Sequence, residues 1–225
     1  MRRAMILVCL LLLAACASLP AHRPTGFVDA ASVVPGLEVE MRYATAHNFV
    51  GRPVHGYQRP VCLLTVQAAT ALAKVQADLA ADGLGLKVYD CYRPRRAVAD
   101  FARWARDLGD MRTKSEFYPD IDKTRLFELG YIAARSGHSR GSTLDLTLVR
   151  LGATPAEIDM GTPFDLFSPH SWPSDRTVSP QAQANRARLA AAMARRGFKP
   201  LEQEWWHFTL IGEPSPDRYF DFAVR

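Results

Sequence analysis

The chain has 225 residues, of which 48% are hydrophobic and 23% charged, and its formal net charge is +5. This length and balance suit one ordinary domain with a substantial core, and they exclude disordered and fibrous classes. The mild positive charge, without any run of lysine or arginine interleaved with aromatic residues, argues against a nucleic-acid partner.

The first fifteen residues are typical of a secretory leader. Two arginines form its basic head, and the apolar stretch Met5–Leu13 is too short to span a membrane. "LAAC", which ends at Cys16, resembles a bacterial lipobox, in which the cysteine takes the lipid; an ordinary signal-peptidase cut is the alternative. We expect a signal peptide over 1–15, a tether over 16–25, and an exported, periplasmic protein that the lipid on Cys16 alone holds to a membrane.

Residues 26–225 show helix and strand patterns that predict one domain. In chain order we expect an edge strand within 33–45, a helix over 65–82, a strand over 84–90, a helix from Pro94 within 93–109, a surface loop over 117–124, a strand over 142–149, a helix over 180–196 and a last strand over 204–211. The second helix spaces Val98, Phe101, Trp104 and Leu108 along one apolar face. The order indicates an α+β fold, with an antiparallel sheet core flanked by helices.

Cys62 and Cys91 are the two cysteines that remain once the leader is removed and Cys16 carries lipid. An oxidising location favours a disulfide between them. A helix over 65–82 rises about 27 Å, and a strand back over 84–91 covers about 26 Å. Antiparallel packing of the two would therefore bring the cysteines together, whereas two separate buried thiols are the alternative.

His138 and Asp145 are candidate metal ligands. They lie seven positions apart in "SGHSRGSTLDLTL", and strand alternation puts Asp145 on the face opposite the leucines. The pair alone is weak evidence for a metal site, because a histidine beside a hairpin commonly forms a hydrogen bond only with the backbone. Catalytic zinc typically takes three protein ligands and keeps a fourth position for water, so another ligand is needed.

"EWWH" offers Glu204 as a candidate base and His207 as a candidate third ligand. The apolar setting of the two tryptophans favours a general base, although an aromatic strand with polar ends is the plain alternative. In an ideal strand the two residues face opposite sides, so both reach one site only if the strand kinks or begins after Glu204. Arg93, between a strand and a helix, is placed to stabilise a developing oxyanion or to pair with a surface acid. Together these segments suggest metal-assisted hydrolysis.

The motifs resemble those of the D-alanyl-D-alanine dipeptidases, the VanX-type zinc peptidases. "SGHSRGSTLDLTL" matches their S-x-H-x-x-G-x-x-x-D signature, and "EWWHF" matches their terminal box. "RYATAHNFVGRPVHGY", "DCYRPRRAV", "FYPDIDKT", "GYIAARSGHSRGS", "MGTPFD" and "YFDF" also match, in family order from about Val33 to the C-terminus.

This resemblance implies a set of catalytic roles. His138, Asp145 and His207 would bind one zinc ion per chain, on the sheet. Glu204 would be the general base that later protonates the leaving amine, and Arg93 would stabilise the tetrahedral intermediate.

The resemblance also implies substrate contacts. Ser136 matches the signature serine and is expected to contact the substrate backbone. Asp165, in "MGTPFD", is expected either to hold the substrate ammonium or to orient a ligand imidazole. Tyr43 could wall the same pocket, although plain loop packing is the alternative.

We therefore predict an exported zinc metallopeptidase that hydrolyses the dipeptide D-Ala-D-Ala to two D-Ala, in peptidoglycan turnover or recycling. One alternative is a zinc D,D-carboxypeptidase that acts on longer wall peptides. The other is a catalytically silent wall-binding module, which would have no need of Glu204 or Arg93. The expected partners are a small D,D-dipeptide and a membrane reached through the lipid anchor.

Overall fold

The protein is described from a computed structural model, which places residues 22–225. The expected signal peptide, the lipid site at Cys16 and the tether up to residue 21 lie outside the described residues. Among the residues placed, no helix is both long enough and apolar enough to cross a membrane.

A six-stranded sheet forms the centre of the fold. Its strands are β2 (Glu38–Val39), β4 (Leu84–Asp90), β5 (Thr143–Arg150), β6 (Ala156–Glu157), β7 (Phe198–Leu201) and β8 (Glu204–Leu210). The main order is β2-β4-β5-β8-β7, with β6 on one end of β5. The β2–β4 pair is parallel and the other pairs are antiparallel. β1 (Phe27–Asp29) and β3 (Leu63–Thr65) form a separate antiparallel pair.

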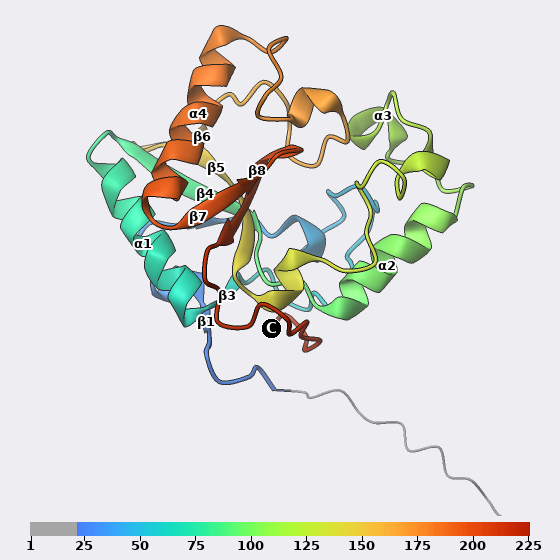
Figure 1. Cartoon of the computed structure of the whole chain (residues 1–225), viewed down its shortest axis with the longest axis horizontal. Helices are drawn as coiled ribbons and strands as arrows, with labels where there is room; N and C mark the ends of the chain where they lie inside the picture. The colour runs from blue at the N-terminus through green and yellow to red at the C-terminus, as the bar shows by residue number, and fades with distance from the viewer. Residues whose placement is uncertain (1–21) are drawn as a thin grey trace, which may run out of the picture.

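Helices pack around this sheet. They are α1 (Val66–Ala80), α2 (Arg95–Arg106), α3 (Lys114–Phe117) and α4 (Pro180–Arg195). α1 and α4 contact each other and lie on one side of the strands, whereas α2 and α3 lie on the other side (Figure 1). The predicted α+β class, with a largely antiparallel sheet flanked by helices, is confirmed.

Hydroxyl side chains cap the N-termini of α1 and α4. The Thr65 hydroxyl accepts a hydrogen bond from the backbone N–H of Ala68, and Ser179 caps α4 in the same way. These side chains satisfy N–H groups that the first helical turn leaves unpaired. Gly197, at a φ of +83°, ends the last helix and turns the chain into β7.

Three local predictions hold only in part. The edge strand expected within 33–45 is reduced to β2, because a 3-10 turn over Arg42–Ala44 replaces its second half. α2 ends at Arg106, so Leu108 lies beyond the helix and is 52% exposed. The segment 117–124 lies at the surface as expected, but Phe117, Tyr118, Ile121 and Lys123 within it are buried. The buried Lys123 ammonium draws it inward by donating to the carbonyls of Asp107 and Asp110.

A disulfide joins Cys62 to Cys91. The two Cα atoms are 5.3 Å apart, although 29 positions separate the residues along the chain. Cross-linking a loop of this size stabilises a folded chain by about 3–4 kcal/mol on the chain-entropy account. The bond fixes the end of β4 against the segment that leads into β3.

Asp100, buried on α2, holds the loop that precedes β3. Its carboxylate accepts two hydrogen bonds from the Arg52 guanidinium and one from the backbone N–H of His55. Burial works against the charge, but these donors outweigh it and lower the pKa of Asp100 from 3.8 to about 2. The stabilisation is therefore present at neutral pH and is lost as the pH falls from about 4 to about 2.

We expect Asp100→Asn to lower the free energy of unfolding at pH 7 by about 1–3 kcal/mol, because a charged acceptor is lost from a buried network. The difference from the wild type should shrink at pH 3, and denaturant unfolding at both pH values measures it. Asp82→Asn is the control. Asp82 forms an exposed ion pair with Arg188, and exposed pairs contribute little to stability. A deficit for Asp100→Asn that grows at low pH would contradict this account.

Candidate metal centre and catalytic pocket

Three elements bring the candidate ligands together. His138 lies on a 3-10 turn over Gly137–Arg140, Asp145 on β5 and His207 on β8. Asp145 and His207 are direct cross-strand partners, so their side chains leave the sheet on the same face.

Gly141 connects the turn of His138 to β5. Its φ is +85°, a left-handed conformation that glycine adopts without strain. A Cβ atom at this position would clash with the ring of Phe27. Upstream, the Ser136 hydroxyl accepts a hydrogen bond from the backbone N–H of His138 and caps the turn. The serine and glycine of the signature therefore shape the backbone that aims His138 at Asp145.

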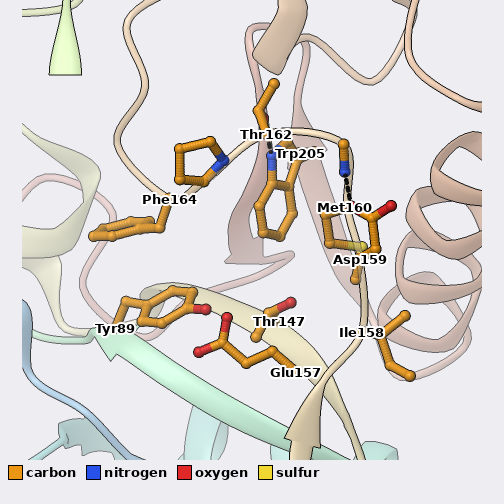
Figure 2. A pocket seen from close by; sticks show the side chains of 11 residues that line it. Tyr89, Thr147, Glu157, Ile158, Asp159, Met160, Thr162, Phe164 and Trp205 are labelled. Atoms are coloured by element: carbon orange, nitrogen blue, oxygen red, sulfur yellow. Dashed lines mark hydrogen bonds between the residues drawn. The ribbon is translucent and has the colours of Figure 1, made fainter. Parts of the chain in front are cut away.

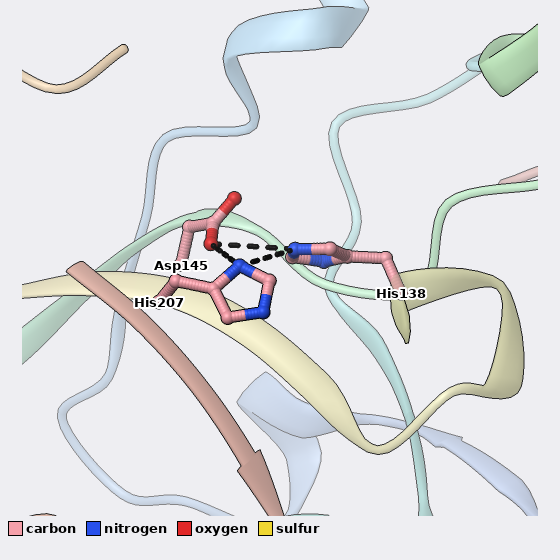
Figure 3. A group of neighbouring side chains, drawn as sticks. All are labelled: His138, Asp145 and His207. Atoms are coloured by element: carbon pink, nitrogen blue, oxygen red, sulfur yellow. Dashed lines mark hydrogen bonds and ion pairs between the residues drawn. The ribbon is translucent and has the colours of Figure 1, made fainter. Parts of the chain in front are cut away.

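The three ligand atoms lie at the spacing that zinc requires (Figure 3). Asp145 Oδ1 is 3.3 Å from His138 Nε2 and 3.2 Å from His207 Nδ1, and the two ring nitrogens are 3.3 Å apart. Atoms bound at about 2.0–2.1 Å to a tetrahedral zinc ion lie about 3.3–3.4 Å from one another. Two imidazoles and one carboxylate are also a donor set that zinc prefers.

Hydrogen bonding leaves these atoms available to a cation. His138 Nδ1 lies 2.8 Å from the Cys91 carbonyl oxygen, which can only accept. Nδ1 therefore carries the proton, and Nε2 keeps its lone pair for a metal. Asp145 Oδ1 is buried and has no hydrogen-bond donor among the described residues. A buried carboxylate oxygen of this kind is costly unless a cation faces it, so the residues fit a bound zinc ion.

The charges of this cluster are strongly coupled. Burial opposes ionisation of Asp145, but the imidazoles of His138 and His207 outweigh it and hold the pKa of this carboxyl far below its usual range. Burial likewise disfavours a charged His207 ring, yet Asp145 and Glu204 raise the pKa of His207 to about 9. A metal ion therefore competes with a proton for His207 Nδ1.

Glu204 lies beside the ligands. It is the first residue of β8, where the pairing with β7 shifts register between Pro200 and Leu201. The irregular ladder lets Glu204 and His207 face one site, and Glu204 Oε2 is 3.3 Å from His207 Nδ1. The strand thus begins at Glu204 and not after it.

The tryptophans that follow Glu204 do not enclose its carboxylate. Its side chain is 22% exposed, and it faces the cavity. Trp205 and Trp206 are buried and pack against each other. They belong to the core, and they leave the carboxylate open to water.

Arg93 reaches the same cluster from the loop between β4 and α2. Its Nε donates to Asp90 Oδ2 at 2.9 Å, and an Nη atom is 3.5 Å from Asp145 Oδ2. The guanidinium carbon lies about 5 Å above the rings of Tyr43 and Phe101. Burial disfavours its charge, but Asp90 and the neighbouring groups raise the pKa of Arg93 well above the usual value. A permanent, fixed positive charge therefore faces the candidate metal position.

Asp90 is a site residue that the sequence reasoning missed. It is fully buried at the end of β4, where it accepts hydrogen bonds from Tyr57 at 2.6 Å and from Arg93. The same oxygen that binds Arg93 is 3.4 Å from His138 Nδ1. Asp90 therefore orients the guanidinium, and its negative charge lies next to the His138 ring. The signal was present in "YDCYRPRR", where an acid ends an apolar strand three residues before an arginine.

A cavity of about 300 Å³ opens onto these groups. The three predicted substrate contacts, Ser136, Asp165 and Tyr43, line it together with Arg93 and the ligands. Asp165 is buried and accepts a hydrogen bond from the Tyr43 hydroxyl at 2.8 Å. Burial and the negative charge of Asp145 raise the pKa of Asp165 well above its usual value.

Two roles were considered for Asp165, and the hydrogen bond that the structure gives it comes from Tyr43 and not from a ligand imidazole. The proton of His138 Nδ1 goes to the Cys91 carbonyl, and His207 Nδ1 faces Asp145 and Glu204. Asp165 instead has a φ of +62°, and its carboxylate holds Tyr43. Tyr43 is therefore a wall of the pocket with a defined polar partner.

A second cavity, of about 400 Å³, shares no lining residue with the first. Tyr89, Glu157 and Trp205 face it, and its wall carries no histidine or arginine (Figure 2). Glu157 is neutralised by Lys87 at 2.9 Å. The metal-binding donor set therefore assigns the candidate site to the smaller cavity.

A largely antiparallel sheet that brings two imidazoles and a carboxylate together beside a second carboxylate and a buried guanidinium defines a metal-dependent hydrolase. The profile of peptidase family M15, D-ala-D-ala dipeptidase, matches residues 23–225. The chain therefore belongs to the D-Ala-D-Ala dipeptidase family of zinc metallopeptidases, and the predicted family and enzyme class are confirmed.

Individual relatives cover nearly the same residues. A protein named D-alanyl-D-alanine dipeptidase from Streptomyces coelicolor is 45% identical over 88% of this chain and 96% of its own length. Proteins of the same name are 40% identical in Enterococcus faecium and 41% in Enterococcus faecalis, over 89% and 88% of this chain and 98% of their own lengths. A zinc-bound structure of the vancomycin resistance D,D-pentapeptidase VanY aligns with 72% of this chain and 80% of its own, at a TM-score of 0.41 and 13% identity.

Proposed function

We propose that this protein hydrolyses D-Ala-D-Ala to two molecules of D-Ala with one zinc ion per chain. The observation that carries the proposal is the convergence of His138, Asp145 and His207 at 3.2–3.3 Å, with Glu204 alongside. Membership in the dipeptidase family and the names of its relatives support the same substrate.

Each polar group at the site has a task in amide hydrolysis. Zinc, when bound, polarises the scissile carbonyl and acidifies water. Glu204 takes the proton of the attacking water and passes it to the leaving amine, since its partly exposed carboxylate faces the cavity. Arg93, fixed by Asp90, stabilises the negative charge that develops on the carbonyl oxygen. The Cys91 carbonyl keeps His138 in the tautomer that can bind the ion.

The cavity suits a short substrate. Its volume of about 300 Å³ is at the lower end of the ~300–1,000 Å³ that small-molecule sites span. A free ammonium group needs an anion, and Asp165, held by Tyr43, supplies one at the wall; the ammonium would favour the ionised carboxyl. Ser136 lines the cavity beside His138 and is placed to contact the substrate backbone.

We further propose that the mature domain spans residues 26–225 and acts in peptidoglycan turnover outside the cytoplasm, on a lipid anchor at Cys16. "LAAC" after an apolar leader supports the anchor, and the Cys62–Cys91 disulfide suits an oxidising compartment. A mature N-terminus other than lipid-modified Cys16, measured by mass spectrometry, would contradict the anchor.

The direct test is hydrolysis of D-Ala-D-Ala by the purified protein before and after treatment with a chelator. We expect release of D-Ala to stop when the metal is removed and to return when one equivalent of Zn²⁺ is added. A wall pentapeptide that ends in D-Ala-D-Ala is the second substrate. Equal release of D-Ala from it would favour the carboxypeptidase, and binding without hydrolysis of either would favour a wall-binding module.

A further inference from the structure

A dipeptidase has to recognise a free carboxylate as well as an ammonium, and the wall of the catalytic cavity offers limited means to do so. Besides the metal ligands, its cationic side chains are Arg93 and Arg135. A guanidinium is well matched to a carboxylate, because its parallel N–H groups can donate to both oxygens.

Arg93 is already committed. Its Nε donates to Asp90, a second nitrogen is 3.5 Å from Asp145, and the side chain is only 13% exposed. Two buried carboxylates therefore balance its charge, and its remaining task lies at the scissile carbonyl.

Arg135 is in the opposite situation. It is exposed, and it forms no ion pair with any carboxylate in the part of the chain that the structure describes, residues 22–225. Its guanidinium carbon lies 5.6 Å from the ring centroid of Tyr219, a contact that holds the group in place and leaves its charge unbalanced.

The position of Arg135 joins the catalytic cavity to a larger basic groove. The residue lines both the cavity and a groove of about 980 Å³ along α2. Arg95, Arg106 and Arg218 lie in the same groove. A positive surface of this kind attracts an anionic group toward the mouth of the site.

We propose that Arg135 binds the C-terminal carboxylate of the substrate and thereby makes the enzyme selective for a free carboxyl end. The inference rests on the proposed function, whose reaction it does not alter. Arg135 determines specificity at the rim, while Glu204 and Arg93 act on the scissile bond.

The test compares D-Ala-D-Ala with D-Ala-D-alaninamide, which has the same scissile bond and no terminal charge. We expect Arg135→Gln to lower kcat/KM for the free acid about tenfold to a hundredfold, mainly through KM, since a charged hydrogen-bond pair is lost. The amide should react equally well with both proteins, or, where it is not cleaved, inhibit both with equal constants. Arg135→Lys should recover part of the loss for the free acid.

Arg218→Gln is the matched control. Arg218 lies in the same groove with its guanidinium over Phe220, but it does not line the catalytic cavity. Its replacement should leave kcat/KM for both substrates unchanged. Equal zinc content in all variants shows that the metal site is intact. The inference is overturned if Arg135→Gln lowers kcat/KM equally for the two substrates, or for neither. A wild type that cleaves neither substrate overturns the proposed function itself.

Discussion

Glu204→Gln is expected to retain one zinc ion per chain and to lose about 10²–10⁴ in kcat for D-Ala-D-Ala. Glutamine keeps the size of the side chain and removes the group that accepts a proton from water. The zinc content is unchanged, because the three ligand atoms come from other residues. Initial rates of D-Ala release, measured beside metal analysis of the same samples, give both quantities.

Glu202 provides the control for this variant. It is exposed in the same hairpin turn, two residues before Glu204, so Glu202→Gln makes the same chemical change outside the cavity. It should keep full activity. If Glu204→Gln were as active as Glu202→Gln, the base would have to be another group.

His207→Ala is expected to weaken zinc binding by more than about 100-fold and to abolish turnover at limiting metal. Loss of even a residue that supports a ligand commonly costs 10–100-fold in affinity, and a ligand itself contributes more. The change also leaves Asp145 with one imidazole instead of two. Equilibrium dialysis against a zinc buffer measures the affinity, and the hydrolysis assay measures the activity.

His170→Ala is the comparison for the metal ligand. Its ring is exposed and bonds to Asp175 and Thr177, far along the chain from the candidate ligands. The variant should bind zinc as the wild type does. Undiminished zinc affinity in His207→Ala would show that the ion is held elsewhere.

The candidate ligands could be predicted from the sequence because their positions follow from simple local rules. Strand alternation places Asp145 on the polar face of β5. Gly141, three positions after His138, allows the turn that directs the His138 ring toward Asp145. "EWWH" offered His207 as the third candidate ligand, and the family resemblance implied the same role. Cross-strand pairing of Asp145 with His207 then accounts for the distance between them.

Other features depend on contacts between distant segments, which no local pattern reveals. Asp90 is a site residue because Tyr57, Arg93 and His138 surround it. The register shift near Leu201 decides that Glu204 can share a face with His207. In both cases tertiary packing, and not the local sequence, determines the position of the side chain.

The disulfide has a consequence for how the enzyme becomes competent. The carbonyl that accepts the proton of His138 Nδ1 belongs to Cys91, whose side chain is bonded to Cys62. The disulfide thus restrains the backbone carbonyl that sets the tautomer of His138, a candidate zinc ligand. Formation of the disulfide therefore helps to fix the geometry of the candidate metal centre.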